Sequence, residues 1–233
     1  MAKAFDTWTV LPHKPIEKLA DNLWRVTGTM PNGRTRRQMV LARLADGRVL
    51  VHNAIALSEA EMAEIEAWGA PAVLFVPNGF HRQDAAIWKQ RYPSMTVVAP
   101  AGSRKRVEQV VPVDATSDQV QLDDAVSLAP IEGVPAESVL QIRSADGVTL
   151  VVCDALFNLP RGGAVENLLF GPTGKVAVAR VARWFLVKDR RAYARALQRW
   201  AETPDLCRVL VGHGRPIVDD PATQLRSAAA QIS

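Results

Sequence analysis

The sequence predicts a layered α/β fold with mixed β-sheets, formed by residues 1–233 as a single domain. Short apolar runs alternate along the chain with longer amphipathic segments, the pattern of strands and helices packed in layers. Two hairpin signatures lie 100 residues apart, and each is followed by helical segments and a further apolar strand. With 48% apolar residues in 233, the chain can bury a core without disulfides.

The first half contains the clearest local signals. Ser58 and Glu61 form a capping box, which predicts a helix over 59–68 that Gly69 ends. The pair Asp46-Gly47 is a hairpin turn between two apolar runs. Strands are predicted over 23–27, 38–44, 49–52, 72–76 and 96–99, and helices over 84–92 and 102–110.

The second half repeats the hairpin. Segments 43–51 and 143–151 match at most positions, including a second turn pair, Asp146-Gly147. Two interpretations of this match are open. One is chance similarity between short hairpins, and the other is an ancestral duplication, which predicts pseudo-symmetric halves of about 19–115 and 116–230. Strands are predicted over 139–143, 149–152 and 207–211, and helices over 175–186, 190–200 and 221–230.

Composition excludes several classes of protein. Two cysteines cannot build a disulfide framework or a four-thiolate zinc site. The first residues lack the apolar run of a signal peptide, and no stretch is long enough to span a membrane, so we expect a soluble, cytoplasmic protein with no membrane partner. An unknown small molecule is the expected partner, and a homo-oligomer is left open.

The net charge of +4 is unevenly distributed. Arginines gather in 34–37 and 180–199, which are either solvated helix faces or a platform for nucleic acid. No clustered aromatic platform and no known nucleic-acid module accompanies these arginines, so nucleic acid is the less favoured partner.

Three polar residues follow predicted buried strands, where α/β folds place their sites: His81, Asp154 and His213. Two imidazoles and a carboxylate are a suitable ligand set for zinc or iron, with an open position for water. The alternatives are a loop histidine at 81, a turn cap at 154 and a buried structural hydrogen bond at 213. His52 and Asn53 end another strand and are expected to hydrogen-bond into the same region.

The order of elements, the duplicated hairpin and two segments resemble the metallo-β-lactamase-fold superfamily, and more narrowly an uncharacterised branch of it. These segments are Cys-Asp-Ala-Leu-Phe-Asn (153–158) and Val-Leu-Val-Gly-His-Gly-Arg-Pro-Ile (209–217). The resemblance covers about 19–230. It implies a four-layer αββα sandwich with a metal site along one edge of the sheets.

The metal motif of the superfamily is degenerate here. Its His-x-His-x-Asp-His signature corresponds to Asn-Gly-Phe-His-Arg-Gln-Asp (78–84), and Val134 stands at a further ligand position. The resemblance therefore implies one zinc, iron or manganese ion on His81, Asp154 and His213 instead of two ions.

Two functions follow from this resemblance. One is a mononuclear hydrolase of esters, thioesters or amides, with Asp154 and His213 in the catalytic site and Asp84 as proton acceptor. The alternative is a non-catalytic relative without metal that binds a small ligand or a protein.

Overall fold

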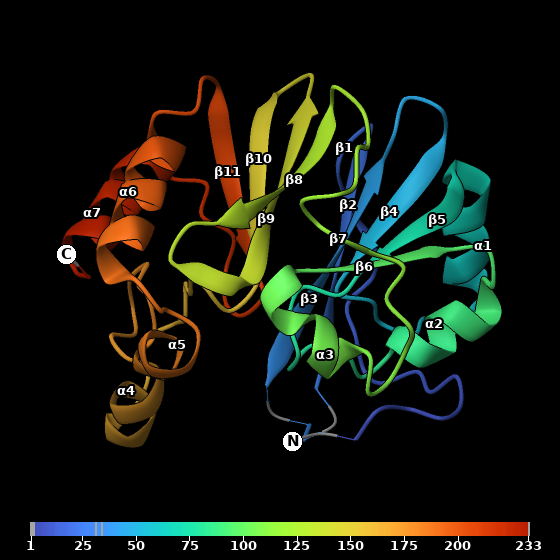
Figure 1. The fold of residues 1–233 in the computed structure, drawn as a ribbon, viewed down its shortest axis with the longest axis horizontal. Helices are drawn as coiled ribbons and strands as arrows, with labels where there is room; N and C mark the ends of the chain where they lie inside the picture. Colours follow the sequence, from blue (N-terminus) through green and yellow to red (C-terminus); the bar gives the residue numbers. More distant parts are fainter. Residues whose placement is uncertain (1–2, 31, 34, 233) are drawn as a thin grey trace.

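The computed structural model describes all residues except 1–2, 31, 34 and 233, and its two β-sheets face each other with helices on both outer sides (Figure 1). The first sheet has the strand order β1-β2-β3-β4-β5-β6-β7. Its strands are β1 (Glu17–Ala20), β2 (Leu23–Thr29), β3 (Arg36–Arg43), β4 (Arg48–His52), β5 (Ala70–Phe75), β6 (Thr96–Ala99) and β7 (Ala115–Thr116). Strands β1 to β4 pair antiparallel, whereas β4 to β7 pair parallel.

The second sheet has the order β11-β10-β9-β8 and comes entirely from the second half of the chain. Its strands are β8 (Val126–Ile131), β9 (Val134–Ser144), β10 (Gly147–Val152) and β11 (Leu206–Val211). The hairpin β9–β10 is followed by the parallel strand β11, as the hairpin β3–β4 is followed by the parallel strand β5. The two similar hairpin sequences thus occupy equivalent places in the two sheets, although the sheets differ in strand number.

The helices are α1 (Glu59–Trp68), α2 (Ala85–Arg91), the 3-10 turn η1 (Ala101–Ser103), α3 (Arg104–Val107), α4 (Ala164–Phe170), α5 (Arg180–Phe185), α6 (Arg190–Ala201) and α7 (Pro221–Ala230). The capping box of α1 is present as predicted, with Ser58 and Glu61 bonded reciprocally. None of the described helices is long and apolar enough to cross a membrane.

Three apolar clusters confirm the four-layer αββα arrangement. Leu50, Phe75, Leu140 and Leu210 belong to the cluster between the sheets. A second cluster joins the outer face of the first sheet to α1 and α2, and a third joins the outer face of the second sheet to α5, α6 and α7. Each sheet therefore buries both faces, which explains the nearly continuous apolar runs of its central strands.

Several predicted elements were wrong. The helix predicted over 175–186 begins only at Arg180, because Ala177 exchanges two backbone hydrogen bonds with Phe157 in an isolated bridge. The helix predicted over 102–110 is divided into η1 and α3. Strands β1, β7 and β8 and helix α4 were not predicted. In β8 only the two end residues, Val126 and Ile131, are buried, so its sequence lacks the regular alternation of a half-buried strand.

Candidate metal centre

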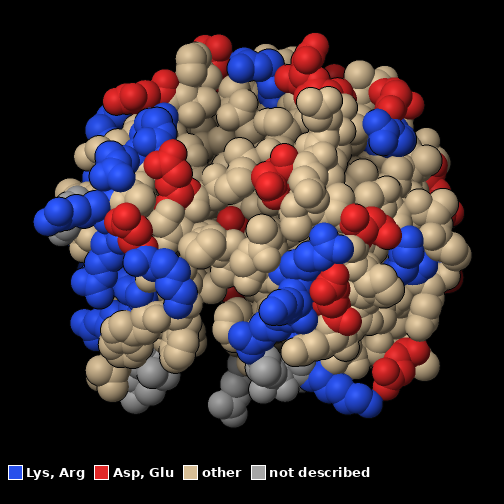
Figure 2. All heavy atoms as spheres, viewed as in Figure 1, with Lys and Arg blue, Asp and Glu red and all other residues tan. Residues whose placement is uncertain are grey.

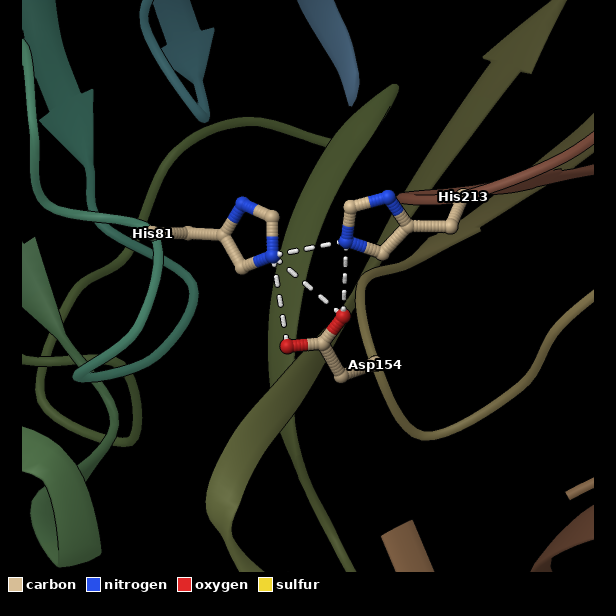
Figure 3. Close-up of side chains that lie close together, drawn as sticks. All are labelled: His81, Asp154 and His213. Atoms are coloured by element: carbon tan, nitrogen blue, oxygen red, sulfur yellow. Dashed lines mark hydrogen bonds and ion pairs between the residues drawn. The ribbon is translucent and has the colours of Figure 1, made fainter. Parts of the chain in front are cut away.

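The three predicted ligands lie in loops that leave the ends of parallel strands. His81 lies in the loop between β5 and α2, Asp154 follows β10 and His213 follows β11. The rings of both histidines and the carboxylate of Asp154 point toward one another (Figure 3). Side chains separated by up to 132 residues in the chain are therefore brought together between the two sheets.

The spacing of the three side chains fits a single metal ion. His81 Nε2 lies 3.1 Å from His213 Nε2 and 3.3 Å from Asp154 Oδ1, and His213 Nε2 lies 3.2 Å from the same oxygen. In a tetrahedral zinc site with metal–ligand distances of about 2.0–2.1 Å, two ligand atoms lie about 3.3 Å apart. Among the described residues, three ligand atoms match this spacing, and a tetrahedral ion held by them would have a fourth position for a non-protein ligand.

Hydrogen bonds to the far nitrogens orient both imidazoles. His81 Nδ1 lies 3.2 Å from Asn53 Oδ1, and His213 Nδ1 lies 2.5 Å from the carbonyl oxygen of Arg36. The Asn53 amide is itself oriented, because its Nδ2 donates to the Gln38 carbonyl at 2.7 Å. Since both partners are acceptors, each Nδ1 carries a proton, which leaves Nε2 as the metal-binding nitrogen in the neutral form of each ring. This is the tautomer that metal-ligating histidines require.

Two further residues hold Asp154. Asn78 Nδ2 donates to Asp154 Oδ2 at 3.0 Å and to Glu137 Oε1 at 2.6 Å. Glu137 in turn accepts the backbone N–H groups of Asp154 and Ala155 at 2.8 and 2.9 Å. Sequence reasoning missed Asn78 and Glu137. The sequence offered one signal for Glu137, which is that a carboxylate stands next to the apolar residues of a predicted strand; that segment forms the buried part of β9.

The electrostatics of the site follow from burial and close contact. Burial acts to raise the pKa of Asp154, but His81 and His213 outweigh it and hold that pKa well below its usual range. Burial acts to lower the pKa of His213, but Asp154 outweighs it and raises the pKa. Burial, aided by the charge of Asp154, raises the pKa of Glu137 to about 8.

The glycines on either side of His213 serve backbone packing. A Cβ atom on Gly212 would lie 2.8 Å from Cys153 Sγ, and Gly214 has φ +110 and packs against the backbone of Asn158. Small residues are therefore needed here for the approach of the loop after β10, and this approach places His213 beside Asp154.

The structure does not bring Asp84 into the group. Its carboxylate forms a 2.6 Å ion pair with Arg37, both side chains being 1% exposed, and accepts the Ala56 N–H at 3.0 Å. Asp84 is not among the described residues that line the cleft, and its role as proton acceptor stays a prediction. Val134 is buried in the outer core of the second sheet, as its apolar side chain requires.

The arginine-rich segment 34–37 is not an exposed platform throughout. Arg37 is buried, Arg36 is exposed, and Arg34 lies outside the described residues. A second group of potential ligand atoms, in Glu137, Cys153 and Asp154, is also unsuited to a cation, because N–H donors already occupy the oxygens of Glu137. Burial also raises the pKa of the Cys153 thiol well above its usual range.

A cleft of about 870 Å³ opens beside the three side chains. One wall comes from the segments around β2 and β3, and the other from the loop after β10, helix α5 and the loop after β11. Phe157 stacks against His213 with ring centroids 5.8 Å apart and an interplanar angle of 11°. The candidate centre thus lies at the base of a cleft large enough for a small organic molecule.

Comparison with known proteins agrees on the fold. The chain is similar to the metallo-β-lactamase DIM-1, with 14% identity, a TM-score of 0.65 and coverage of 96% of this chain and 100% of that one. It is also similar to FIM-1 from Pseudomonas aeruginosa in its mono-zinc form, with 11% identity, a TM-score of 0.62 and coverage of 95% and 96%. A metallo-β-lactamase from Erythrobacter litoralis is similar as well, with 13% identity, a TM-score of 0.61 and coverage of 93% of this chain and 96% of that one.

No protein-family model and no curated protein sequence matches the chain. The structural matches nevertheless extend over nearly the whole of both chains. The protein therefore has the metallo-β-lactamase fold, as the sequence resemblance implied.

Proposed function

We propose that this protein is a metal-dependent hydrolase that uses one divalent ion held by His81, Asp154 and His213. The observation that carries the proposal is the pair of Nε2 atoms 3.1 Å apart, both turned toward one carboxylate. The Nδ1 protons are directed at Asn53 and at the Arg36 carbonyl, so neither neutral ring can place a proton between the two Nε2 atoms by exchanging tautomers. The contact therefore calls for a metal ion, or for one extra proton, between the two rings and the carboxylate.

The ion would be zinc, iron or manganese, since neutral imidazole and carboxylate ligands suit all three. Bound zinc with an open position would lower the pKa of a water molecule to about 7 and so would supply a nucleophile at neutral pH. The chain supplies three ligands and their orienting partners, together with a cleft that admits a substrate beside the centre. Ester, thioester and amide carbonyls are the expected targets. The likeness to FIM-1 in a mono-zinc form supports a one-ion site.

The proposal assigns no proton transfer to Asp84, because Arg37 and the Ala56 N–H already use its oxygens. Within the described lining of the cleft, Asp154 is the one carboxylate. Since Asp154 would itself hold the ion and its pKa lies well below its usual range, solvent would be the proton acceptor.

A non-catalytic relative is the second candidate. One proton shared among His81, His213 and Asp154 would also satisfy the cluster, as a buried hydrogen-bonded network. The protein would then bind a small ligand or a protein partner in the cleft without chemistry.

Metal content separates the two candidates. Protein purified without chelator is expected to contain one equivalent of zinc, iron or manganese by elemental analysis, and chelator-treated protein is expected to take up one equivalent in calorimetry. The double variant Asp154→Ala/His213→Ala should lose this uptake with modest loss of stability. His13→Ala is the matched control, because His13 lies in the amino-terminal segment and pairs with Glu61.

The candidate functions predict opposite results for the double variant. Absence of metal from the purified wild type, with no uptake on titration and a large loss of stability in the double variant, would establish the non-catalytic candidate. Retention of full metal uptake by the double variant would show that the ion binds elsewhere. Hydrolysis of ester, thioester and amide substrates by the metal-loaded protein then tests the reaction itself.

A further inference from the structure

We propose that the cleft binds amphiphilic anions, molecules that join an extended apolar part to a carboxylate or a similar anionic group. As a statement about substrate class this rests on the proposed hydrolase function, whereas the binding itself is a property of the cleft alone.

The first observation is an excess of positive charge. Four exposed cationic side chains line the cleft: Lys14, Arg36, Arg161 and Arg215. Asp154, between two histidines, is the one carboxylate in the described lining. None of the described carboxylates forms an ion pair with any of these four cations. Their charge is thus left for a ligand to neutralise, and it attracts anions into the cleft.

The cations lie on both walls. Lys14 and Arg36 come from the amino-terminal half, whereas Arg161 and Arg215 come from the loops after β10 and β11. Arg36 and Arg215 are both attached closely to the candidate metal centre. The carbonyl oxygen of Arg36 accepts a hydrogen bond from His213, and Arg215 follows His213 by two residues in the sequence. Figure 2 shows a hollow between the lobe that carries α5 and the rest of the molecule. An anionic group near the centre would therefore be reached from two sides.

The second observation is an apolar wall that includes incompletely buried aromatic side chains. Phe170 and Phe185 line the cleft, yet they are 39% and 65% exposed. The remaining large apolar side chains of the lining are Met30, Phe80, Phe157, Leu159, Val181 and Leu186. Exposed aromatic side chains in a concave site indicate a ligand with an apolar body, because such a ligand removes their surface from water.

Charge and apolar surface together restrict the ligand. A small inorganic anion would leave the aromatic wall in water, and a neutral lipid would leave the four cations without a counter-charge. A cationic amphiphile would be repelled. An amphiphilic anion satisfies both walls of the cleft at once.

Calorimetry on chelator-treated protein tests the inference without any contribution from a metal. The probes are decanoate, decyltrimethylammonium and acetate, all below their micelle-forming concentrations. We expect decanoate to bind at least about tenfold more tightly than either of the others, because only decanoate combines a negative charge with an apolar chain.

Matched variants separate the two walls of the cleft. Arg36→Gln and Arg215→Gln should each weaken decanoate binding by about fivefold, whereas Arg226→Gln, on the exposed face of α7, should leave it unchanged. Phe185→Ser should also weaken decanoate binding by about fivefold. Trp184→Ser is its control, because Trp184 is similarly exposed at 61% but is not part of the cleft lining.

Decyltrimethylammonium binding as tightly as decanoate would overturn the inference, as would an Arg36→Gln/Arg215→Gln variant within twofold of the wild type. Failure of decanoate to bind would overturn it as well. Because no metal is present in this experiment, anion binding by a protein that never takes up metal would support this inference while refuting the proposed function. Metal uptake without anion selectivity would do the reverse.

Discussion

The buried pair Arg37–Asp84 allows a direct test of whether Asp84 is catalytic or structural. The two charged groups lie 2.6 Å apart with side chains 1% exposed. Burial raises the pKa of Asp84 even though Arg37 opposes this, so desolvation of the carboxylate outweighs its pairing. Removing one charge therefore leaves the other buried without compensation, whereas removing both relieves the desolvation of both.

The two single substitutions should differ in cost. Asp84→Asn leaves a buried guanidinium that cannot lose its proton, which costs about 3–5 kcal/mol of unfolding free energy. Arg37→Met leaves a carboxyl that can take up a proton, so its cost should be smaller by at least about 1 kcal/mol. The variant with both substitutions, Arg37→Met/Asp84→Asn, should be at least about 2 kcal/mol more stable than Asp84→Asn alone, because no unpaired charge remains.

Urea unfolding at pH 7, followed by tryptophan fluorescence, measures these differences, and metal uptake of each folded variant is measured in parallel. A catalytic Asp84 would give an Asp84→Asn variant that keeps wild-type stability and metal uptake and loses hydrolysis. Destabilisation of Asp84→Asn by less than about 1 kcal/mol would refute the structural reasoning.

Three further outcomes are expected. His52 is buried without a hydrogen-bond partner among the described residues, and burial lowers its pKa from 6.5 to about 3, so its folded-state pKa lies below its unfolded value. The protein should then lose stability as pH falls below 6.5, and His52→Phe should remove about 2–3 kcal/mol of the loss between pH 7 and 4.5 in urea unfolding; parallel pH profiles for the two proteins would contradict this. Asn53→Gly, which suits the local φ of +56, should weaken metal binding about 10–100-fold by releasing the His81 ring, and calorimetry finding unchanged affinity would refute the orienting role. Gly214→Ala should lower the unfolding midpoint and metal affinity together, because φ is +110 and the Asn158 backbone blocks a Cβ; a variant with wild-type values would show that the loop relaxes freely.

Local sequence was sufficient wherever the deciding forces were local. The helix over 59–68 was predicted with its observed ends, because the reciprocal bonds of Ser58 and Glu61 and the break at Gly69 need no distant partner. The two hairpins followed from turn residues and apolar runs for the same reason. The start of the helix predicted over 175–186 was wrong, because the bridge between Ala177 and Phe157 is a tertiary contact that local helix propensity does not indicate.

The three candidate ligands could be selected from the sequence because each follows an apolar strand, and parallel strands end at a common edge. Asn53 was expected to hydrogen-bond into this region because it ends another strand, and it contacts His81. Tertiary structure alone decided the support of Asp154. Asn78 and Glu137 reach it through contacts across as many as 76 residues, and a polar residue in a loop or strand does not reveal its partner. The pairing of Asp84 with Arg37 likewise depends on how β3 packs against the loop before α2. The sequence by itself therefore determined the layered fold and the ligand types, which follow from local pattern and chemistry. The tautomers of the histidines, the buried support of Asp154 and the charged cleft depend on long-range packing, which only the folded chain establishes.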